Sequence, residues 1–348
     1  MPDDPSLGVL RALTALEVEP VVARPHVDHD DLGAIRYVKV AARGDTHDPM
    51  DFRWSRKGLR SALRDAGADI VHVVGDPWTP NAEAGAAAAR SVGVPYVLVG
   101  NSIVGGPTGT IARWQARRVV EGAAALGGTS RPAMERLANG RAGVPQGVVP
   151  PSTLAFPPRR TPRTDSSPVV IGSIGRVMGE RGLDVLFAAL GTTFGDWRLR
   201  IVGTGPAQEA LEAQAQRLGL SSRIEWLGAI PRDALGEFWG SLDVLVTPSR
   251  ATPSWVEPNA HQVLDAMAHG IAVVVTRSGV LPDVVGESGL IVEPDDATAL
   301  ARALQGLVEQ PSRVETLGEA ARKRVVERFS DVAIADRMVA LWRQALAR

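Results

Sequence analysis

The stretch Leu242–Gly279, LDVLVTPSRATPSWVEPNAHQVLDAMAHGIAVVVTRSG, decides the fold of the chain around it. Its first part, DVLVTPS, and its last part, AVVVTRSG, are short runs rich in β-branched residues, which predict buried strands. Between them, NAHQVLDAMAHG predicts a helix. A strand, a helix and a second strand in this order indicate a βαβ unit of a parallel sheet.

The same alternation extends in both directions from this stretch. Further strands are predicted at DIVHVVG, PYVLVG, AALGGTS, VVIGSIGR, WRLRIVGTG, RIEWLGAI and GLIV. Helices are predicted at SLGVLRALTALEV, NAEAGAAAARSVG, TIARWQARRVVEGA, RGLDVLFAALGTTF, PAQEALEAQAQRLGL and DALGEFWGSL. We expect two helices to close the chain, at Ala297–Gln310 and Asp331–Arg348.

The segment Pro150–Pro168 is rich in Pro, Ser and Arg and has no hydrophobic period, so it predicts a linker. A length of 348 residues suits two domains. We therefore expect an N-terminal domain over 1–158, a second domain over 159–330 and a C-terminal helix over 331–348 that packs back on the first domain. The fold class is α/β, with two doubly wound Rossmann-like domains facing a central cleft, where ligands bind beyond the carboxyl ends of the strands.

Composition excludes several classes of protein. The net charge of −1 gives no global field that would attract nucleic acid, so no nucleic-acid partner is expected. The absence of cysteine excludes disulfides, zinc thiolate sites and cysteine nucleophiles. No apolar run reaches the ~18 residues of a membrane span, and the acidic start lacks the basic region of a signal peptide, so we expect a cytoplasmic protein.

Two loops that follow predicted strands carry candidate binding residues. In GSIGRVMGERGLD (Gly172–Asp184), Arg176 and Arg181 flank a turn that contains Gly175 and could clamp a diphosphate. In WLGAI, a glycine lets a flat ligand such as a nucleobase approach the backbone. The residues expected there are Gly228, Ala229 and Ile230.

A third loop leads into the helix of the opening stretch. Free backbone N–H groups in the first turn of that helix predict an anion site. The residues of that turn are Asn259, Ala260, His261 and Gln262. Glu257 stands before the turn and Asp265 stands one helical turn inside it, so each carboxylate could hold the hydroxyls of one sugar on either side of a bound diphosphate.

The segment IVGTGPAQEAL imitates a dinucleotide-binding fingerprint. Gly203 and Gly205 match its first two glycines, and Glu225 follows at the distance of the ribose-binding acid. Gln208 stands where the third glycine belongs, and a tight strand-to-helix turn requires glycines in any case. A dinucleotide site is therefore the weaker interpretation.

The pattern W-x-E-P-x-x-x-x-V-x-D-A-M-A-x-G-x-x-V-V-V, with SG-x-L-P-D-V-V-G downstream, resembles the donor domain of family 4 retaining glycosyltransferases of the GT-B fold. That family carries a Glu-x7-Glu motif, and Glu257 and Asp265 have its spacing. GSIGRVMGERGLDVLFAAL resembles the diphosphate-binding segment, with Arg176 and Arg181 on the positions of its arginine and lysine. The resemblance runs from about Ile171 to Phe329 and is fainter before it.

The resemblance implies transfer of a sugar from a nucleotide-diphosphate donor with retention of configuration. It assigns donor-sugar hydroxyls to Glu257, the ribose to Asp265 and the diphosphate to Arg176 and Arg181. It requires no metal ion and no cofactor. The acceptor it implies is a saccharide, a lipid-linked group or a small natural product. The sequence alone does not predict whether the protein contacts a membrane surface or forms a homodimer.

The chain departs from the family in several places. Asp265 is shorter than the usual glutamate, and Asn259–Ala260 replace a common Phe–Gly, so we expect an altered phosphate loop if that loop needs positive φ. The N-terminus begins at what resembles the family's first helix, so we expect the acceptor side to differ from that of the family. The candidate residues on that side are Asn101, where a histidine is common, His72 and Asp76.

Three alternatives to an active glycosyltransferase stay open at this point. A GT-B protein could bind a nucleotide-sugar without transferring it. A sugar-nucleotide epimerase would need titratable groups from both domains, and the first domain offers few. An NAD oxidoreductase would bind a nicotinamide cofactor. The base, the sugar and the acceptor cannot be inferred from the sequence.

Overall fold

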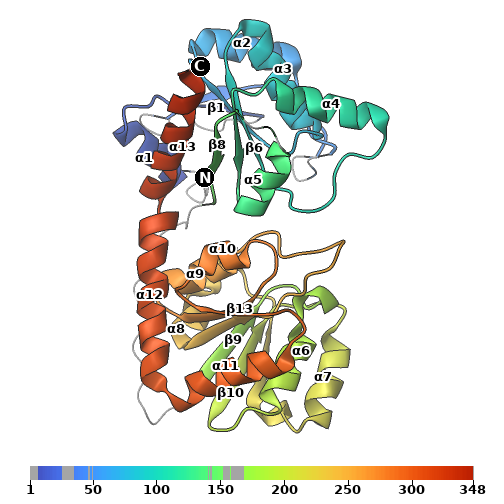
Figure 1. The fold of residues 1–348 in the computed structure, drawn as a ribbon, viewed down its shortest axis with the longest axis vertical. Helices are drawn as coiled ribbons and strands as arrows, with labels where there is room; N and C mark the ends of the chain where they lie inside the picture. The colour runs from blue at the N-terminus through green and yellow to red at the C-terminus, as the bar shows by residue number, and fades with distance from the viewer. Residues whose placement is uncertain are drawn as a thin grey trace. The chain divides into compact units, whose positions relative to one another are not determined.

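The computed structural model describes residues 7–25, 35–45, 48, 50–139, 141, 143–151, 157 and 168–347. The chain divides into two compact units, both visible in Figure 1. Unit 1 comprises Met1–Leu154 and Ser330–Arg348, and unit 2 comprises Ala155–Phe329. The division falls inside the Pro-rich segment, and the last helix belongs to unit 1.

Unit 1 is built on a parallel four-stranded sheet in the order β5-β6-β7-β8, with a parallel pair β1-β2 and an antiparallel pair β3-β4. The strands are β1 (Val21–Arg24), β2 (Arg36–Lys39), β3 (Ala42–Arg43), β4 (Arg53–Trp54), β5 (Val71–Val74), β6 (Tyr96–Gly100), β7 (Ala125–Gly128) and β8 (Gln146–Val148). The helices are α1 (Leu7–Ala15), α2 (Arg56–Ala66), α3 (Pro80–Val92), α4 (Thr110–Glu121), α5 (Arg131–Ala138) and α13 (Asp331–Leu346).

Unit 2 is built on one parallel six-stranded sheet in the order β11-β10-β9-β12-β13-β14. The strands are β9 (Val169–Ile174), β10 (Trp197–Val202), β11 (Ile224–Gly228), β12 (Val244–Thr247), β13 (Ala272–Thr276) and β14 (Leu290–Val292). The helices are α6 (Leu183–Leu190), α7 (Gln208–Arg217), α8 (Gly236–Ser241), α9 (His261–Ala268), α10 (Leu281–Val285), α11 (Ala297–Glu309) and α12 (Pro311–Phe329). Three 3-10 turns, η1 (Gly179–Arg181), η2 (Ser221–Arg223) and η3 (Arg232–Ala234), join them.

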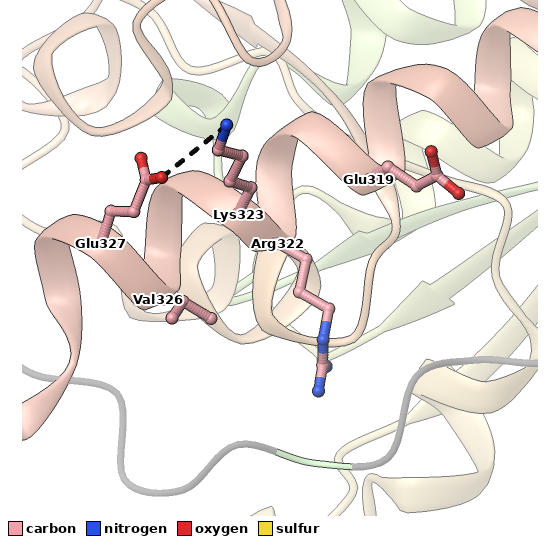
Figure 2. A pocket seen from close by; sticks show the side chains of 5 residues that line it. All are labelled: Glu319, Arg322, Lys323, Val326 and Glu327. Atoms are coloured by element: carbon pink, nitrogen blue, oxygen red, sulfur yellow. Dashed lines mark ion pairs between the residues drawn. The ribbon is translucent and has the colours of Figure 1, made fainter.

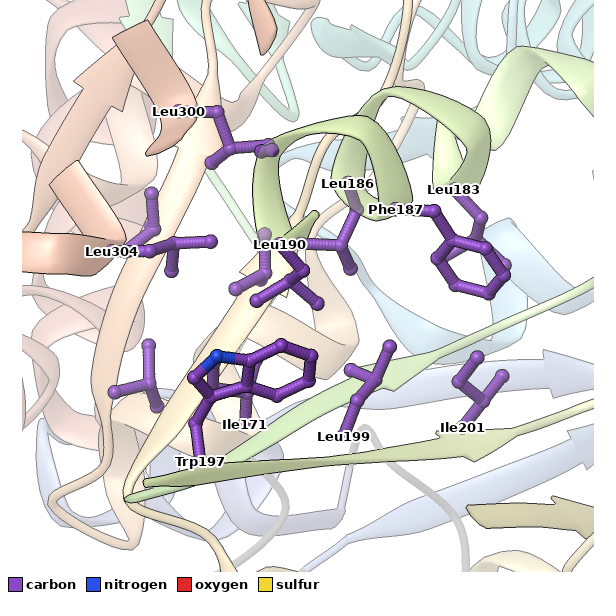
Figure 3. Close-up of a cluster of buried hydrophobic side chains, with 14 of the residues drawn as sticks. Ile171, Leu183, Leu186, Phe187, Leu190, Trp197, Leu199, Ile201, Leu300 and Leu304 are labelled. Atoms are coloured by element: carbon purple, nitrogen blue, oxygen red, sulfur yellow. The ribbon is translucent and has the colours of Figure 1, made fainter. Parts of the chain in front are cut away.

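The core of unit 2 forms because its central strands are apolar on both faces. Every residue of β13 is buried, as expected of a parallel strand covered by helices on both sides. Figure 3 shows side chains of α6, among them Phe187 and Leu190, facing Trp197 and Leu199 of β10. The Trp197 indole N–H is satisfied by the Thr193 carbonyl at 3.1 Å, so this large aromatic ring is buried without loss of a hydrogen bond.

The prediction of two closing helices was wrong, because a third one, α12, lies between them. Its buried stripe consists largely of small and β-branched residues rather than leucines, so its period was weak in the sequence. Gly318 lies in this stripe, and a Cβ there would come within 2.1 Å of the Gly270 carbonyl oxygen. The close contact between α12 and the end of α9 therefore depends on a glycine. None of the helices in the described part of the chain has the length and apolar character needed to cross a membrane.

Helix α13 is anchored in unit 1 through its contacts with α1, β6, β7 and β8. Within this interface, the Trp342 indole N–H donates a hydrogen bond of 3.0 Å to Nδ1 of His72 on β5, and the two rings meet edge to face. An acceptor at Nδ1 requires a neutral imidazole with its proton on Nε2. Burial lowers the pKa of His72 from its usual value of 6.5 to about 4.

This depressed pKa predicts a stability that depends on pH. The unfolded chain takes up a proton on His72 near pH 6.5, whereas the folded chain resists protonation down to about pH 4. Stability should therefore fall by about 2 to 3 kcal/mol as the pH drops from 6.5 to 4. In His72→Gln, whose side-chain oxygen still accepts a hydrogen bond, this part of the slope should vanish. Urea unfolding of both proteins between pH 6.5 and 4 measures this dependence. If the free energy of unfolding fell equally with pH in the two proteins, the depressed pKa of His72 would not be its cause.

Candidate functional site

The strand order of unit 2 reverses between β9 and β12, so the carboxyl ends of these two strands form the switch point of the sheet. From β9 the chain proceeds outward through β10 to β11, and it then returns to β12 and proceeds the other way to β14. In doubly wound sheets, ligands bind beyond the carboxyl ends of the strands at such a switch point. The loop after β9 carries Arg176 and Arg181, and the loop after β12 carries Glu257.

Glycines allow the β9 loop to lie closely against the end of β12. Gly182 has φ +67°, and a Cβ at this position would lie 2.1 Å from the Pro248 carbonyl oxygen. Gly175 has φ +142°, and the guanidinium of Arg181 lies 3.4 Å from the position that its Cβ would occupy. Both backbone conformations are strained for residues other than glycine. The η1 turn can therefore present Arg181 across the switch point of the sheet.

Arg181 and Glu257 form a buried ion pair at this point. Arg181 Nη1 lies 2.6 Å from Glu257 Oε2, and the same oxygen accepts a hydrogen bond of 2.7 Å from the Ser249 hydroxyl. The Glu257 side chain is 1% exposed and that of Arg181 is 20% exposed. A carboxylate removed from water to this extent is costly unless it is paired, and here it is paired on one oxygen.

The other polar atoms of the pair lack partners. Glu257 Oε1 and Arg181 Nε are buried and make no hydrogen bond within the described part of the chain. Burial raises the pKa of Glu257, and this shift is opposed by Arg181, by the Ser249 hydroxyl and, least of all, by the Asn259 backbone N–H, which lies near the carboxylate without the geometry of a normal hydrogen bond. Unsatisfied buried polar atoms are rare and costly, so their presence on both partners of one ion pair makes this pair the candidate position for a bound ligand.

The backbone of Glu257 is held as firmly as its side chain. The Ser278 hydroxyl accepts a hydrogen bond of 3.0 Å from the Glu257 N–H, and the Val280 N–H donates to the Glu257 carbonyl at 3.2 Å. Gly279, at φ +52°, lies so close that a Cβ would come within 2.0 Å of that carbonyl oxygen. The Ser-Gly dipeptide after β13 therefore serves to position the glutamate.

Arg250 connects the two loops and was missed by the sequence analysis. Its guanidinium binds both carboxylate oxygens of Asp184, at 2.7 and 3.0 Å, and reaches Asp295 at 2.8 Å. The same guanidinium donates to the Gly179 carbonyl, and the Arg250 N–H donates to the Glu180 carbonyl at 2.9 Å. Arg250 thus ties the η1 turn, which carries Arg181, to the end of β12.

Arg250 also reaches the Glu257 side of the site through its carbonyl oxygen. The Ser278 hydroxyl donates to this oxygen at 2.6 Å, and it is the same hydroxyl that accepts from the Glu257 N–H. Arg250 therefore contacts both the η1 turn that carries Arg181 and the Ser278 hydroxyl that binds the Glu257 backbone. No motif in the sequence indicates this, because the contacts join four separate loops.

Asp265 lies on α9 and is paired with a second residue that the sequence analysis missed. Arg232 Nη2, from η3, lies 3.4 Å from Asp265 Oδ2, and the Asp265 side chain is 23% exposed. Burial raises the pKa of Asp265, and Arg232, followed by His261 and His269, opposes the shift. Arg232 itself is 54% exposed, so this pair is more open than the pair at Glu257.

The start of α9 is regular. Ala260 has φ −133° and precedes the helix, so the expected conflict between Ala260 and a positive φ does not arise. Ala260 is buried, Gln262 is half-buried, and Asn259 and His261 are exposed at the first turn. This eight-residue helix begins at His261, so its N-terminal amide groups follow Glu257 closely in the sequence.

The glycines after β10 and β11 have different surroundings. A Cβ on Gly203 would lie 1.9 Å from the Gly175 carbonyl oxygen, and one on Gly205 would lie 2.1 Å from the Val177 carbonyl oxygen. Close packing against the β9 loop thus explains the apparent dinucleotide fingerprint. Gly228, by contrast, has φ +67° and open space where its Cβ would project, with Ala229 exposed and Ile230 half-buried after it.

The remaining predicted residues make no hydrogen bond or ion pair with Arg181 or Glu257 in the described part of the chain. Arg176 is exposed after β9, and no hydrogen bond or ion pair joins it to another described residue. In unit 1, Asp76 Oδ1 accepts from the backbone N–H groups of Asn101 at 3.2 Å and Ser102 at 3.1 Å, and Oδ2 accepts from the Ser102 hydroxyl. Asp76 therefore holds the loop after β6, and His72 is engaged by Trp342.

A pocket of about 330 Å³ lies along α12 (Figure 2). It is lined by Glu319, Arg322, Lys323, Val326 and Glu327. All five belong to one helix, and Arg322 is engaged by the carbonyl groups of Ala268 and Pro157. The pocket shares no residue with the Arg181–Glu257 site. Among the described residues, no cluster of His, Cys, Asp and Glu is arranged to hold a metal ion.

Comparison with known proteins gives this site a family context. Residues 159–324 match the family of "Glycosyl transferases group 1". The matched segment is 166 of the 348 residues, slightly less than half of the chain. It contains Arg181, Glu257 and Asp265.

Two curated proteins are similar to this chain, the first over 162 residues and the second over 290 residues. A GDP-mannose-dependent α-(1-6)-phosphatidylinositol monomannoside mannosyltransferase of Mycolicibacterium smegmatis is 32% identical over 162 residues, which cover 44% of this chain and 42% of that protein. A 2-deoxystreptamine glucosyltransferase of Streptomyces kanamyceticus is 28% identical over 290 residues, which cover 74% and 72%. The chain thus spans less than half the length of the first relative.

Solved structures resemble the whole chain. HepE from Anabaena in complex with UDP has a TM-score of 0.70 at 17% identity and covers 98% of this chain and 97% of its own. A sucrose-phosphate synthase from Thermosynechococcus elongatus has a TM-score of 0.63 at 21% identity, with coverage of 97% and 92%. The chain has the GT-B fold, as the sequence predicted. Identities this low support the fold and nothing finer.

The Arg250 contacts generate a prediction about the η1 turn. Arg250→Ala should lower the free energy of unfolding by about 1 to 2 kcal/mol, since several charged hydrogen bonds are lost at a partly exposed position. It should also increase amide hydrogen exchange at Gly179–Gly182. Arg277→Ala is the matched control, because Arg277 forms only an exposed pair with Glu293 at 2.7 Å. Exchange in the turn that is equal in the two variants would show that Arg250 does not hold it.

Proposed function

We propose that this protein is a family 4 retaining glycosyltransferase that moves a sugar from a nucleotide-diphosphate donor to an acceptor without a metal ion. The observation that carries the proposal is the Arg181–Glu257 pair at the switch point of the donor-side sheet. Each partner has one buried polar atom without a hydrogen bond, Arg181 Nε and Glu257 Oε1. A diphosphate supplies acceptors for the guanidinium, and a sugar supplies hydroxyl donors for the carboxylate.

Donor binding would exchange partners within this pair. Glu257 Oε1 is buried, so side chains around it must move before a sugar hydroxyl can reach it. A diphosphate anchored by the first-turn amides of α9 and by the exposed Arg176 would draw the Arg181 guanidinium away from Glu257. The freed carboxylate would then accept hydrogen bonds from the donor sugar. Diphosphate binding and sugar binding are thereby coupled through one side chain.

The same residues suit the chemical step. The bond between the anomeric carbon and the diphosphate oxygen breaks, and the bond to the acceptor oxygen forms on the same face of the sugar. The acceptor proton passes to the leaving phosphate oxygen. Negative charge grows on the diphosphate during this step, and two arginines placed beside it would stabilise the transition state more than the ground state.

Asp265 and the loop after β11 suit the nucleoside part of the donor. The Asp265 carboxylate would bind the ribose hydroxyls, and the open space beside Gly228 would admit the base along the backbone. The similar HepE structure holds UDP and the mycobacterial relative is named for GDP-mannose, so uridine and guanosine are the first bases to test.

A second candidate function is nucleotide-sugar binding without transfer. It is favoured by unit 1, where His72 and Asp76, two of the residues predicted for the acceptor side, are engaged in structural hydrogen bonds. Incubating the protein with UDP- and GDP-sugars and a panel of acceptors separates the two functions. Formation of a glycoside with the donor's anomeric configuration supports transfer, whereas donor binding without consumption supports the second candidate.

The proposal predicts binding of a nucleoside diphosphate without divalent metal. Calorimetric titration with UDP, GDP and ADP should give the same dissociation constant for the preferred base in EDTA and in magnesium. The physical reason is that the guanidiniums of Arg176 and Arg181 neutralise the diphosphate. Binding that disappears in EDTA and returns with magnesium would contradict this part of the proposal.

The two acids should fail in different ways. In Glu257→Gln, affinity for the intact nucleotide-sugar should fall about ten-fold or more, because a charged hydrogen-bond acceptor is lost. Affinity for the bare diphosphate should stay equal or increase, because Arg181 loses its competing carboxylate. In Asp265→Asn, both ligands should weaken by a similar factor, because both contain the ribose.

The control for these titrations is Glu225→Gln. Glu225 forms an exposed pair with Arg200 at 2.8 Å on the same sheet, so its loss should change neither affinity. If Glu257→Gln weakened the bare diphosphate as strongly as the nucleotide-sugar, the assignment of Glu257 to the sugar would be wrong.

A further inference from the structure

One helix of unit 1 exposes apolar side chains on its outer face. In α4, Ile111 is 72% exposed and Trp114 is 56% exposed. The helix is anchored from the other side, where Ala116 and Val119 are buried. At 100° per residue, Trp114 projects opposite these two buried residues, so it lies at the centre of the exposed face.

Arginines surround this apolar centre. Arg118 lies one turn after Trp114, with its guanidinium carbon 4.8 Å from the centre of the Trp114 ring. Arg113 and Arg117 are exposed on the other flank, and Arg117 forms a pair of 2.6 Å with Glu121. Helix α4 itself contains three arginines and one glutamate, although the whole chain has a net charge of −1. The exposed face of α4 is therefore locally positive.

From these features we propose that the exposed face of α4 docks on an anionic lipid surface. A tryptophan at the centre, a neighbouring aliphatic side chain and flanking arginines form the pattern of a helix that lies in the plane of a membrane interface. The arginines would bind the phosphate groups of the lipids, and Trp114 and Ile111 would enter the boundary between headgroups and acyl chains. The positive charge of the face and the negative charge of such lipids are complementary.

Other partners fit the same residues less well. A single-stranded nucleic acid would stack on Trp114, but it gives no reason for an isoleucine that is more exposed than the tryptophan. The lipid assignment also explains why the basic residues cluster here in a chain that is otherwise acidic.

Co-sedimentation with vesicles tests the proposal on the full chain. The protein should bind vesicles of phosphatidylglycerol and phosphatidylcholine in ~50 mM salt, bind pure phosphatidylcholine vesicles much less, and lose binding as salt is raised. Arg113→Glu and Arg118→Glu should each weaken binding at least about five-fold. Trp114→Ser should weaken it at every salt concentration, because its contribution is apolar.

Two variants at the C-terminal end of α7 serve as matched controls. Arg217 and Leu218 are an exposed basic residue and an exposed apolar residue side by side in unit 2, so Arg217→Glu and Leu218→Ser change the same chemistry elsewhere. They should bind vesicles like the wild type, and thermal unfolding should be alike for all variants. Absence of binding to anionic vesicles, equal binding to both kinds of vesicle, or equal losses in the α4 and α7 variants would overturn the proposal. Retention of a single-stranded oligonucleotide in place of vesicles would also overturn it.

Discussion

A glutamate that is almost fully removed from water, Glu257, is the constraint on which the organisation of unit 2 depends. Its charge is tolerated because Arg181 and Ser249 meet one of its oxygens, at 2.6 and 2.7 Å. Loss of one partner of such a pair typically costs about 3 to 5 kcal/mol, so the surrounding structure must hold both partners in place. Much of what is unusual in the loops of this unit follows from that requirement.

Three features of the loops hold Arg181 and Glu257 in place. Gly182 allows the Arg181 turn to lie against the end of β12 where a Cβ would collide with Pro248. Ser278 and Gly279 hold the backbone of Glu257. Arg250 joins both supports. These contacts hold the backbone of the site in several places, and the proposed exchange of partners would involve the two atoms without a hydrogen bond, Arg181 Nε and Glu257 Oε1.

The sequence predicted the parts of this arrangement that are local. Strand-like runs and the glycine-rich turns identified the parallel sheet, and a resemblance in spacing singled out Arg181, Glu257 and Asp265. The contacts between loops could not be predicted, because Arg250, Asp184 and Asp295 are distant in the chain and have no characteristic spacing. Helix α12 was missed because its buried face is made of small residues, which give little hydrophobic periodicity. The hydrogen bond between Trp342 and His72 joins residues that are 270 positions apart, so no local pattern predicts it.

A structure of the protein with a non-transferable analogue of its nucleotide-sugar donor tests the central claim most directly. We predict that the diphosphate lies within ~3.2 Å of the Arg181 guanidinium and that Glu257 Oε1 accepts a hydrogen bond from a sugar hydroxyl. We also predict that the Arg181–Glu257 contact of 2.6 Å is lengthened or broken in the complex. A donor bound away from the β9 and β12 loops, or one that leaves this ion pair unchanged and Oε1 without a partner, would contradict the account.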